Sequence, residues 1–244
     1  MTPLLHVDNI SKRFYGFVAL DGVDLMVRPG ERLGLIGPNG SGKSTLVNCI
    51  CGTLQNESGS VRFDGHTLDG LAAHQRTHRG VARTFQLPRP FHSMNLVDNL
   101  RVPLLYTVHA RMGPLRSTGD LDSRCLELLE MVGLAAKAKQ MPRDLTQVEM
   151  RKLELARAVA AEPKLLIADE SMAGLSNSEI DDILVLLVRL NERGITIILI
   201  EHIMSAVMRF SQRLAVLVSG KKVADGKPED VVRDPEVVRA YLGQ

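Results

Sequence analysis

The stretch "GPNGSGKST", residues 37–45, constrains the fold of this chain more than any other feature. The residues before it, "ERLGLI", turn from polar to wholly apolar, as a strand entering a core does. The residues after it, "STLVNCICGTL", place Leu46, Ile50 and Leu54 four positions apart, which is helical spacing. The glycines therefore lie in a turn between a strand and a helix, the setting that a phosphate-binding loop requires.

The residue types of this loop suit a triphosphate. Gly37, Gly40 and Gly42 lack a Cβ, so the backbone can curl tightly and bring its N–H groups close to a ligand. The following helix adds the positive end of its dipole. Lys43 can bind the β- and γ-phosphates, and the Ser44 hydroxyl can ligate Mg²⁺. The alternative, a glycine-rich turn that carries Lys-Ser by chance, is disfavoured by the flanking strand and helix. We therefore predict that the chain binds a nucleoside triphosphate. The other loop residues expected to contact it are Pro38, Asn39, Ser41 and Thr45.

A second group of polar residues follows the apolar run "KLLIADE", residues 164–170. A buried strand explains the apolar residues but does not require two adjacent acids at its end. A metal–triphosphate site does need an acid to hold Mg²⁺ through water, and Asp169 fits that role. Glu170 can orient or deprotonate the attacking water. An acidic strand end can arise by chance, but beside a phosphate loop the functional interpretation is favoured.

Two further polar residues also follow expected strands. His202 comes after "ITIILI", at the carboxyl end of a strand, where ligands lie in such sheets. A lone histidine there is more often a surface residue, so its position alone makes it a candidate γ-phosphate sensor. Gln86 follows the strand that ends in "RTF", immediately before a helical segment.

Strand patterns alternate with helix patterns around the loop, which predicts an α/β core with a mainly parallel sheet. Strands are expected at residues 4–8, 23–28, 32–36, 60–64, 81–85, 164–169, 195–200 and 214–218. The last is expected to form an antiparallel hairpin through "SG" in "LAVLVSGKKVADG". Helices are expected after the loop and at 121–132, 147–161, 177–192 and 203–210. Residues 87–162 read as almost wholly helical, so we predict a helical subdomain inserted between residues 1–86 and 163–244 of one domain.

The composition of the 244 residues is that of a soluble globular protein, with 45% apolar and 24% charged residues. A net charge of +2, with no tryptophan and no basic run among aromatics, argues against nucleic acid as a partner. Cys49, Cys51 and Cys125 are expected to be reduced thiols of a cytosolic protein, since i, i+2 positions on a helix face different ways. The N-terminus lacks the pattern of a signal peptide, and the longest apolar runs are far below the roughly 20 residues of a spanning helix. Any membrane role is expected to act through a partner.

Four motifs, "GPNGSGKST", "RTFQ", "KLLIADE" and "IEH", stand in the order found in the ATPase subunits of ABC transporters, and the chain resembles that family from about residue 4 to Leu242. The stretches "VARTFQLPRPFHSMNLVDNL", "DESMAGLS" and "VVRDPEVVRAYLG" are similar to the ATPases of branched-chain amino-acid importers. The resemblance implies a P-loop NTPase core that uses ATP and Mg²⁺. It also implies that Phe14, with Tyr15 as the alternative, stacks on adenine, although a packed aromatic is an equally simple explanation. Gln86 would then link Mg²⁺ and water to the helical subdomain, and residues 87–110 would contact a permease.

Other nucleotide-binding classes lack support in the sequence. A GTPase would carry Asn-Lys-x-Asp, which does not occur here. A P-loop kinase seldom has a Glu170 equivalent beside the metal aspartate and lacks equivalents of Gln86 and His202. A DNA-repair ATPase of the same superfamily usually has coiled-coil or zinc-binding insertions, and this chain has neither heptads nor suitable cysteine pairs.

The chain departs from the family at its signature, Leu-Ser-Gly-Gly-Gln, where "LTQVE" stands at 145–149. Thr146 keeps a hydroxyl and Glu149 is familiar in importer relatives, but Gln147 and Val148 replace glycines. A β-branched Val148 restricts φ and fills space next to a helix N-terminus whose amides must approach a γ-phosphate. In that family the signature acts on the nucleotide held by a second ATPase subunit, so the resemblance implies that the partner's site is weakened. Ser176 is a milder departure, where many relatives carry Asp or Asn.

The resemblance implies a cytoplasmic ATPase, peripheral at the inner face of the membrane, that powers a separate permease. The simplest hypothesis pairs it with a different ATPase subunit, and a homodimer with two weakened sites is the rival. A lipid or lipopolysaccharide exporter ATPase and a soluble non-transport ABC ATPase remain alternatives. The transported substrate is beyond the sequence, because specificity lies in other subunits.

Overall fold

The computed structural model describes residues 2–85, 87–108 and 118–242. Its central sheet consists of β3 (Arg32–Ile36), β6 (Val81–Arg83), β7 (Leu165–Asp169), β8 (Thr196–Ile200), β9 (Arg213–Val218) and β10 (Lys221–Gly226). The strand order is β10-β9-β3-β8-β7-β6, with every pairing parallel except that of β10 with β9. Strands β7 and β8 are buried along their whole length, as apolar strands covered on both faces are. The predicted mainly parallel sheet with an antiparallel portion is confirmed.

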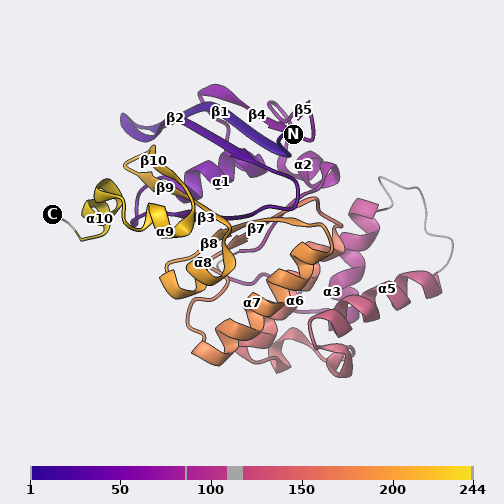
Figure 1. Cartoon of the computed structure of the whole chain (residues 1–244). Coiled ribbons are helices and arrows are strands. Elements are labelled where there is room, and N and C mark those ends of the chain that lie inside the picture. The colour runs from indigo at the N-terminus through magenta and orange to yellow at the C-terminus, as the bar shows by residue number, and fades with distance from the viewer. Residues whose placement is uncertain (1, 86, 109–117, 243–244) are drawn as a thin grey trace.

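A smaller antiparallel sheet lies above the central one in Figure 1. Its strands are β1 (Leu5–Phe14), β2 (Phe17–Val27), β4 (Ser58–Phe63) and β5 (His66–Thr67). The strands expected at 4–8 and 23–28 were too short, because β1 and β2 continue into a hairpin whose exposed residues near the turn, both polar and apolar, break the alternating pattern. Its turn residues Tyr15 and Gly16 have φ values of 47° and 89°, as a tight hairpin turn requires.

Helices cover both faces of the central sheet (Figure 1). They are α1 (Lys43–Cys51), α2 (Ala73–Arg79), α3 (Leu96–Pro103), α5 (Thr118–Met131), α6 (Gln147–Ala160), α7 (Asn177–Glu192), α8 (Met204–Phe210), α9 (Pro228–Val231) and α10 (Pro235–Leu242), with short turns η1 (Leu104–Val108), η2 (Ala135–Lys137) and η3 (Pro142–Asp144). Between β6 and β7 the described elements are all helical, as expected. Helices α2, α9 and α10 were not predicted. In the part of the chain that the structure describes, no helix is long and apolar enough to cross a membrane.

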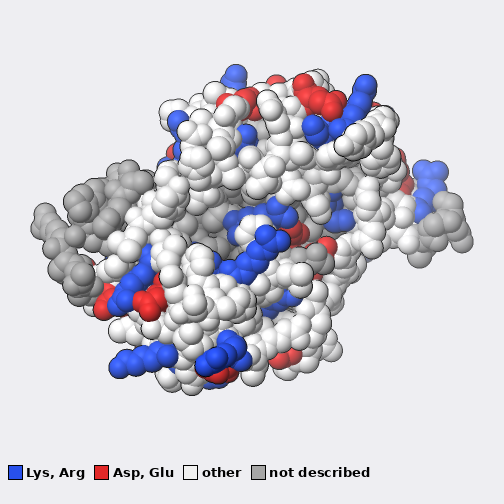
Figure 2. All heavy atoms as spheres, turned by 180° about the vertical axis from the view of Figure 1, so that it is seen from behind, with Lys and Arg blue, Asp and Glu red and all other residues white. Residues whose placement is uncertain are grey.

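Two apolar clusters hold these layers together. One fills the space between the antiparallel sheet, α1 and one face of the central sheet, with Phe63, Leu46 and Ile198 among its members. The other joins the opposite face of the sheet to the helices and includes Leu129, Leu155 and Leu187. On the side turned away from the viewer of Figure 1, the surface between the upper and lower layers is hollowed, and Lys and Arg side chains gather in the hollow (Figure 2).

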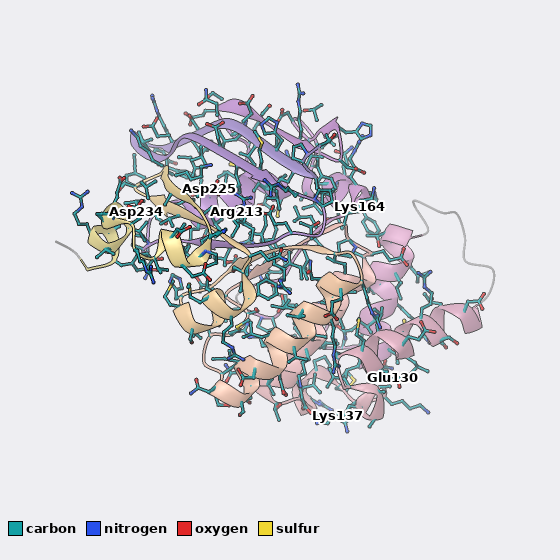
Figure 3. The ribbon with its side chains drawn as sticks, viewed as in Figure 1. Glu130, Lys137, Lys164, Arg213, Asp225 and Asp234 are labelled. Carbon is teal, nitrogen blue, oxygen red and sulfur yellow. The ribbon has the colours of Figure 1, made fainter. Side chains whose placement is uncertain are left out.

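The β9–β10 hairpin supports the loop between β3 and α1. At its turn, the Gly220 N–H donates to the Ser41 carbonyl over 3.0 Å. At its base, Arg213 pairs with Glu31 at 2.6 Å and also with Asp225, which lies on the neighbouring strand (Figure 3). The hairpin is therefore fixed at both ends, and it gives the loop a rigid neighbour.

Candidate nucleotide-binding site

The loop between β3 and α1 has no room for side chains at two of its glycines. Gly37 has a φ of 151°, and a Cβ there would lie 2.1 Å from the Leu217 carbonyl oxygen. Gly42, at the N-cap of α1, has a φ of 104°, and a Cβ there would lie 2.6 Å from the Ala19 carbonyl oxygen. Both positions require glycine, because their positive φ values strain other residues and because a Cβ would collide with backbone atoms. The strand, loop and helix follow one another as the sequence predicts.

Lys43 lies over this loop. Its ammonium donates to the carbonyl oxygens of Gly37 at 2.7 Å and Pro38 at 3.0 Å. Burial lowers the pKa of Lys43, while the carboxylates of Glu170 and Asp169 act in the opposite direction. A cation in a partly dehydrated setting, near a helix N-terminus, attracts a polyphosphate more strongly than an exposed lysine does.

A cavity of about 240 Å³ opens beside the loop. Its lining residues are Phe14, Phe17, Ala19, Asn39, Gly40, Ser41, Gly42, Lys43, Ser44, Thr45, Glu170 and His202. Phe14, the residue expected to stack on adenine, is 40% exposed, and Phe17, which sequence reasoning missed, is 64% exposed. Tyr15 is fully exposed at the hairpin turn and is not among the lining residues. Phe14 and Phe17 lie on either side of that turn. The closeness of Phe17 to Phe14 in the sequence could have indicated it as a second candidate.

Asp169 ends β7 in a buried position and pairs with a cation. Arg83 of β6 donates to its carboxylate over 2.6 Å and, through a second nitrogen, to the Asn48 side chain over 2.6 Å. The backbone N–H of Asp169 donates to the buried Thr84 hydroxyl over 3.2 Å. Sequence reasoning missed Arg83. Its signal is a charged residue in a buried strand, in the "RTFQ" motif itself.

Glu170 and His202, which follow the neighbouring strands β7 and β8, lie in contact. The Oε1 atom of Glu170 and the Nε2 atom of His202 are 3.1 Å apart. The His202 side chain is 43% exposed and that of Glu170 only 21% exposed. A carboxylate and an imidazole in contact at the edge of a phosphate-binding cavity can position a water molecule and a terminal phosphate.

The residues present fit Mg²⁺ bound mainly by phosphates. The Ser44 hydroxyl at the start of α1 and the Asp169 carboxylate are hard oxygen donors, the kind that Mg²⁺ prefers. Among the described residues, no three His, Cys, Asp or Glu side chains gather as a metal cage, and Mg²⁺ in triphosphate sites does not need one. Gln86, the other expected metal contact, lies outside the described residues.

The signature segment begins α6 with a capping box. The Thr146 hydroxyl accepts from the Glu149 N–H at 3.4 Å, and the Glu149 carboxylate accepts from the Thr146 N–H at 3.0 Å. Lys137, labelled low in the helical layer in Figure 3, also bonds to Glu149 at 2.7 Å. These hydrogen bonds lower the pKa of Glu149, with that from Lys137 the largest cause.

The two residues that replace glycines in this segment have different surroundings. The Gln147 amide donates to the Ala173 carbonyl over 3.3 Å, which ties α6 to the loop after β7. Val148 is half-buried and packs against the apolar cluster of the helical layer. Ser176, the milder departure, precedes α7, where its N–H and hydroxyl both donate to the Glu179 carboxylate, at 2.8 and 2.7 Å.

Comparisons with known proteins agree with this geometry. Residues 20–173 match the family model described as ABC transporter, and residues 221–244 match that described as branched-chain amino acid ATP-binding cassette transporter. The chain is 37% identical to the high-affinity branched-chain amino acid transport ATP-binding protein BraF of Pseudomonas aeruginosa, over 99% of this chain and 98% of the relative. The ADP conformation of MJ1267, an ATP-binding cassette of an ABC transporter, is similar with a TM-score of 0.88 and 32% identity over 100% of both chains. A dimeric post-hydrolysis state of the cassette MJ0796, bound to ADP and Pi, is similar with a TM-score of 0.81 and 26% identity, over 92% of this chain and 98% of that one.

Proposed function

Because this chain belongs to the ATPase family of ABC transporters, whose members hydrolyse ATP to power transport, we propose that it drives an importer of branched-chain amino acids or related small solutes. The observation that carries the proposal is a single cavity lined by the phosphate loop, Lys43, Glu170 and His202. The match of residues 221–244 supports a branched-chain importer over the lipid-exporter alternative.

In this proposal the chain's own residues bind and orient ATP. Lys43 exchanges its contacts with the loop carbonyls for contacts with the β- and γ-phosphates, and the loop amides complete the cradle. Phe14 or Phe17 stacks on the adenine. Ser44 and Asp169 would hold Mg²⁺, which would neutralise charge at the phosphates when bound.

Hydrolysis is assigned to the pair at the ends of β7 and β8. Glu170 orients the attacking water and accepts its proton, and His202 holds the γ-phosphate on the other side. Catalysis of this kind depends on positioning and charge stabilisation, so a displacement of either side chain should slow turnover more than it weakens binding.

We further propose that the chain works in a dimer, where its signature segment contacts the partner's nucleotide. The dimeric state of the cassette MJ0796 supports a paired arrangement. Val148 favours a partner with a complete signature, because a half-buried β-branched residue cannot let the amides of α6 approach a phosphate as closely as glycine would. The partner is therefore proposed to be a distinct ATPase subunit.

The permease is proposed to dock beside the helical layer, through residues 87–110. A cavity of about 360 Å³ lies between α2 and β6 on one side and α3, η1 and α6 on the other. Its lining includes aromatic residues stacked on arginines, with Arg157 4.7 Å from the Phe91 ring and Arg83 5.5 Å from the Phe85 ring. Since Arg83 also bonds to Asp169, a partner in this cavity would lie close to the nucleotide site. Through that permease the chain would be peripheral at the cytoplasmic face of the membrane.

The central assignment is tested with Glu170→Gln. The variant should bind ATP with an affinity within a few-fold of wild type but lose turnover by a factor on the order of 100 or more, because only the general base is removed. Titration calorimetry and phosphate release measure the two quantities. Turnover near the wild-type rate would refute the role of Glu170.

The transport assignment needs a separate measurement. Expression with the neighbouring membrane-protein genes, followed by detergent extraction, should yield a complex of this chain with a permease and with a second ATPase subunit. Recovery of this chain alone, in the presence of the expressed permease, would instead favour the soluble non-transport alternative.

A further inference from the structure

Glu170 has an unusual backbone. Its φ is 47°, in the left-handed region that residues other than glycine adopt rarely and that persists only where neighbouring structure holds it. One such restraint is the Glu170 N–H, which donates to the Ile200 carbonyl over 2.8 Å. The second comes two residues later, where the Met172 N–H donates to Oε1 of Glu201 over 2.8 Å. Both restraints come from the end of β8.

The Glu201 carboxyl is shared between two segments. It accepts from the backbone N–H of Met172 over 2.8 Å, and the backbone N–H of the adjacent His202 also favours its charged form. Glu170 and His202 in turn touch at 3.1 Å. The Glu201 side chain therefore joins the segment after Glu170 to the segment that carries His202, next to the contact between these two proposed catalytic residues.

Apolar packing does not account for this carboxyl. Glu201 is only 3% exposed, and a leucine would fill a similar volume without desolvating an acid. Burial, reinforced by the charge of Glu170, raises the pKa of Glu201 to about 7. Glu201 is costly to bury, directly precedes His202 in the chain and bonds to the segment that follows Glu170. It therefore has a structural task that an apolar side chain could not perform.

We propose that Glu201 is a positioning residue for ATP hydrolysis: its carboxyl fixes the segment after Glu170 against the backbone of His202 and so sets the spacing of the two side chains. This inference rests on the proposed roles of Glu170 and His202. It assigns to Glu201 no contact with nucleotide.

The test compares three variants with wild type. Glu201→Ala removes the bridge and should lower kcat by 10- to 100-fold, on the order expected for a small misplacement, with the KM for ATP changed less than about twofold. Glu201→Gln keeps one acceptor oxygen and should recover kcat to within about threefold of wild type. Glu229→Ala, at an exposed position of α9, is the matched control for loss of a glutamate and should behave as wild type.

Hydrogen exchange gives a readout independent of turnover. The amides of Met172 and His202 should exchange faster in Glu201→Ala than in wild type, and Glu201→Gln should protect at least one of them. If Glu201→Ala does not fold, Glu201→Asp takes its place, because it keeps the acid but shortens its reach by one methylene, and it should show the same selective loss of kcat.

The outcomes separate this inference from the proposed function. A folded Glu201→Ala or Glu201→Asp variant with wild-type kcat, alongside an inactive Glu170→Gln, would overturn the positioning role and leave the function intact. An active Glu170→Gln would remove the proposed catalytic pair and the inference with it. A loss that appears equally in KM and kcat, with no rescue by Gln, would show a structural role only and would also overturn the proposal.

Discussion

Replacing Glu201 with glutamine should change how the free energy of unfolding depends on pH. Burial raises the pKa of this carboxyl from 4.5 to about 7 in the folded protein, and the charge of Glu170 acts in the same direction. The amides of Met172 and His202 oppose the rise without cancelling it. The folded chain therefore keeps this proton to about neutral pH, whereas the unfolded chain releases it in mild acid.

The sign and the size follow from linkage. Between the two pKa values the folded state binds more protons than the unfolded state, so the free energy of unfolding falls as the pH rises. Below the lower pKa and above the higher one, this contribution is constant. One pKa unit corresponds to about 1.4 kcal/mol, so the full difference is about 3 kcal/mol. Glu201→Gln lacks the titration and should escape this loss.

Urea unfolding of wild type and Glu201→Gln, in buffers from about pH 5 to about pH 8, measures the effect. The free energy of unfolding of the variant minus that of wild type should grow by about 2–3 kcal/mol across that range. Glu229→Gln, at an exposed position of α9, serves as the control for loss of one carboxylate from the net charge. A difference that stays flat, or that shrinks with rising pH, would refute the reasoning that this acid is kept protonated by burial.

Three further predictions concern the loop and its neighbours. Lys43→Ala should weaken ATP binding by on the order of 100-fold in calorimetry, because it removes a buried cation aimed at the phosphates; an unchanged affinity would contradict that role. Arg83→Met should lower the free energy of unfolding by about 3 kcal/mol in urea titrations, because it leaves the Asp169 carboxylate buried without its cation; a neutral effect would mean that water replaces the arginine. Val148→Gly should raise the ATPase rate of a reconstituted pair with the partner subunit above that of a Val148→Ala control, and equal rates would argue against the steric explanation.

The loop between β3 and α1 and the strands beside it could be predicted because their sequence patterns are local. Gly37 and Gly42 occupy positions where a Cβ would collide with backbone atoms, so glycine at these positions indicates a tightly curled loop. Strand β3 was predicted with the bounds that the structure has, and so was helix α7, whose buried residues recur at helical spacing. Because neighbouring parallel strands end at one edge of a sheet, Glu170 and His202 lie at the same edge and contact each other.

The remaining features depend on contacts between distant residues. Helix α2 reads "AHQRTHR", with no apolar stripe, and it is fixed instead by Arg76, which reaches the Cys49 and Ile50 carbonyls at 2.7 and 3.0 Å. Arg83 stands out as a charged residue in a buried strand, but its partner Asp169 lies 86 positions away, so the sequence does not identify the ion pair. The sequence did not indicate a role for Glu201, because its carboxyl bonds to the Met172 N–H, which lies 29 positions earlier in the chain.

The structure shows the surroundings of the residues that depart from the family's signature. The capping box of Thr146 and Glu149 is intact, so α6 begins at Gln147 with its first turn capped. Gln147 adds a link to the Ala173 carbonyl, which fastens that helix to the loop following Glu170. Val148 packs toward the helical layer and is compatible with the fold of this chain. The substitution therefore leaves the chain's own nucleotide cavity as it is, and its effect should fall on what this chain offers to a partner's nucleotide. The proposed asymmetric pair, in which this chain keeps its own proposed catalytic residues but assists the partner's site poorly, is compatible with these contacts.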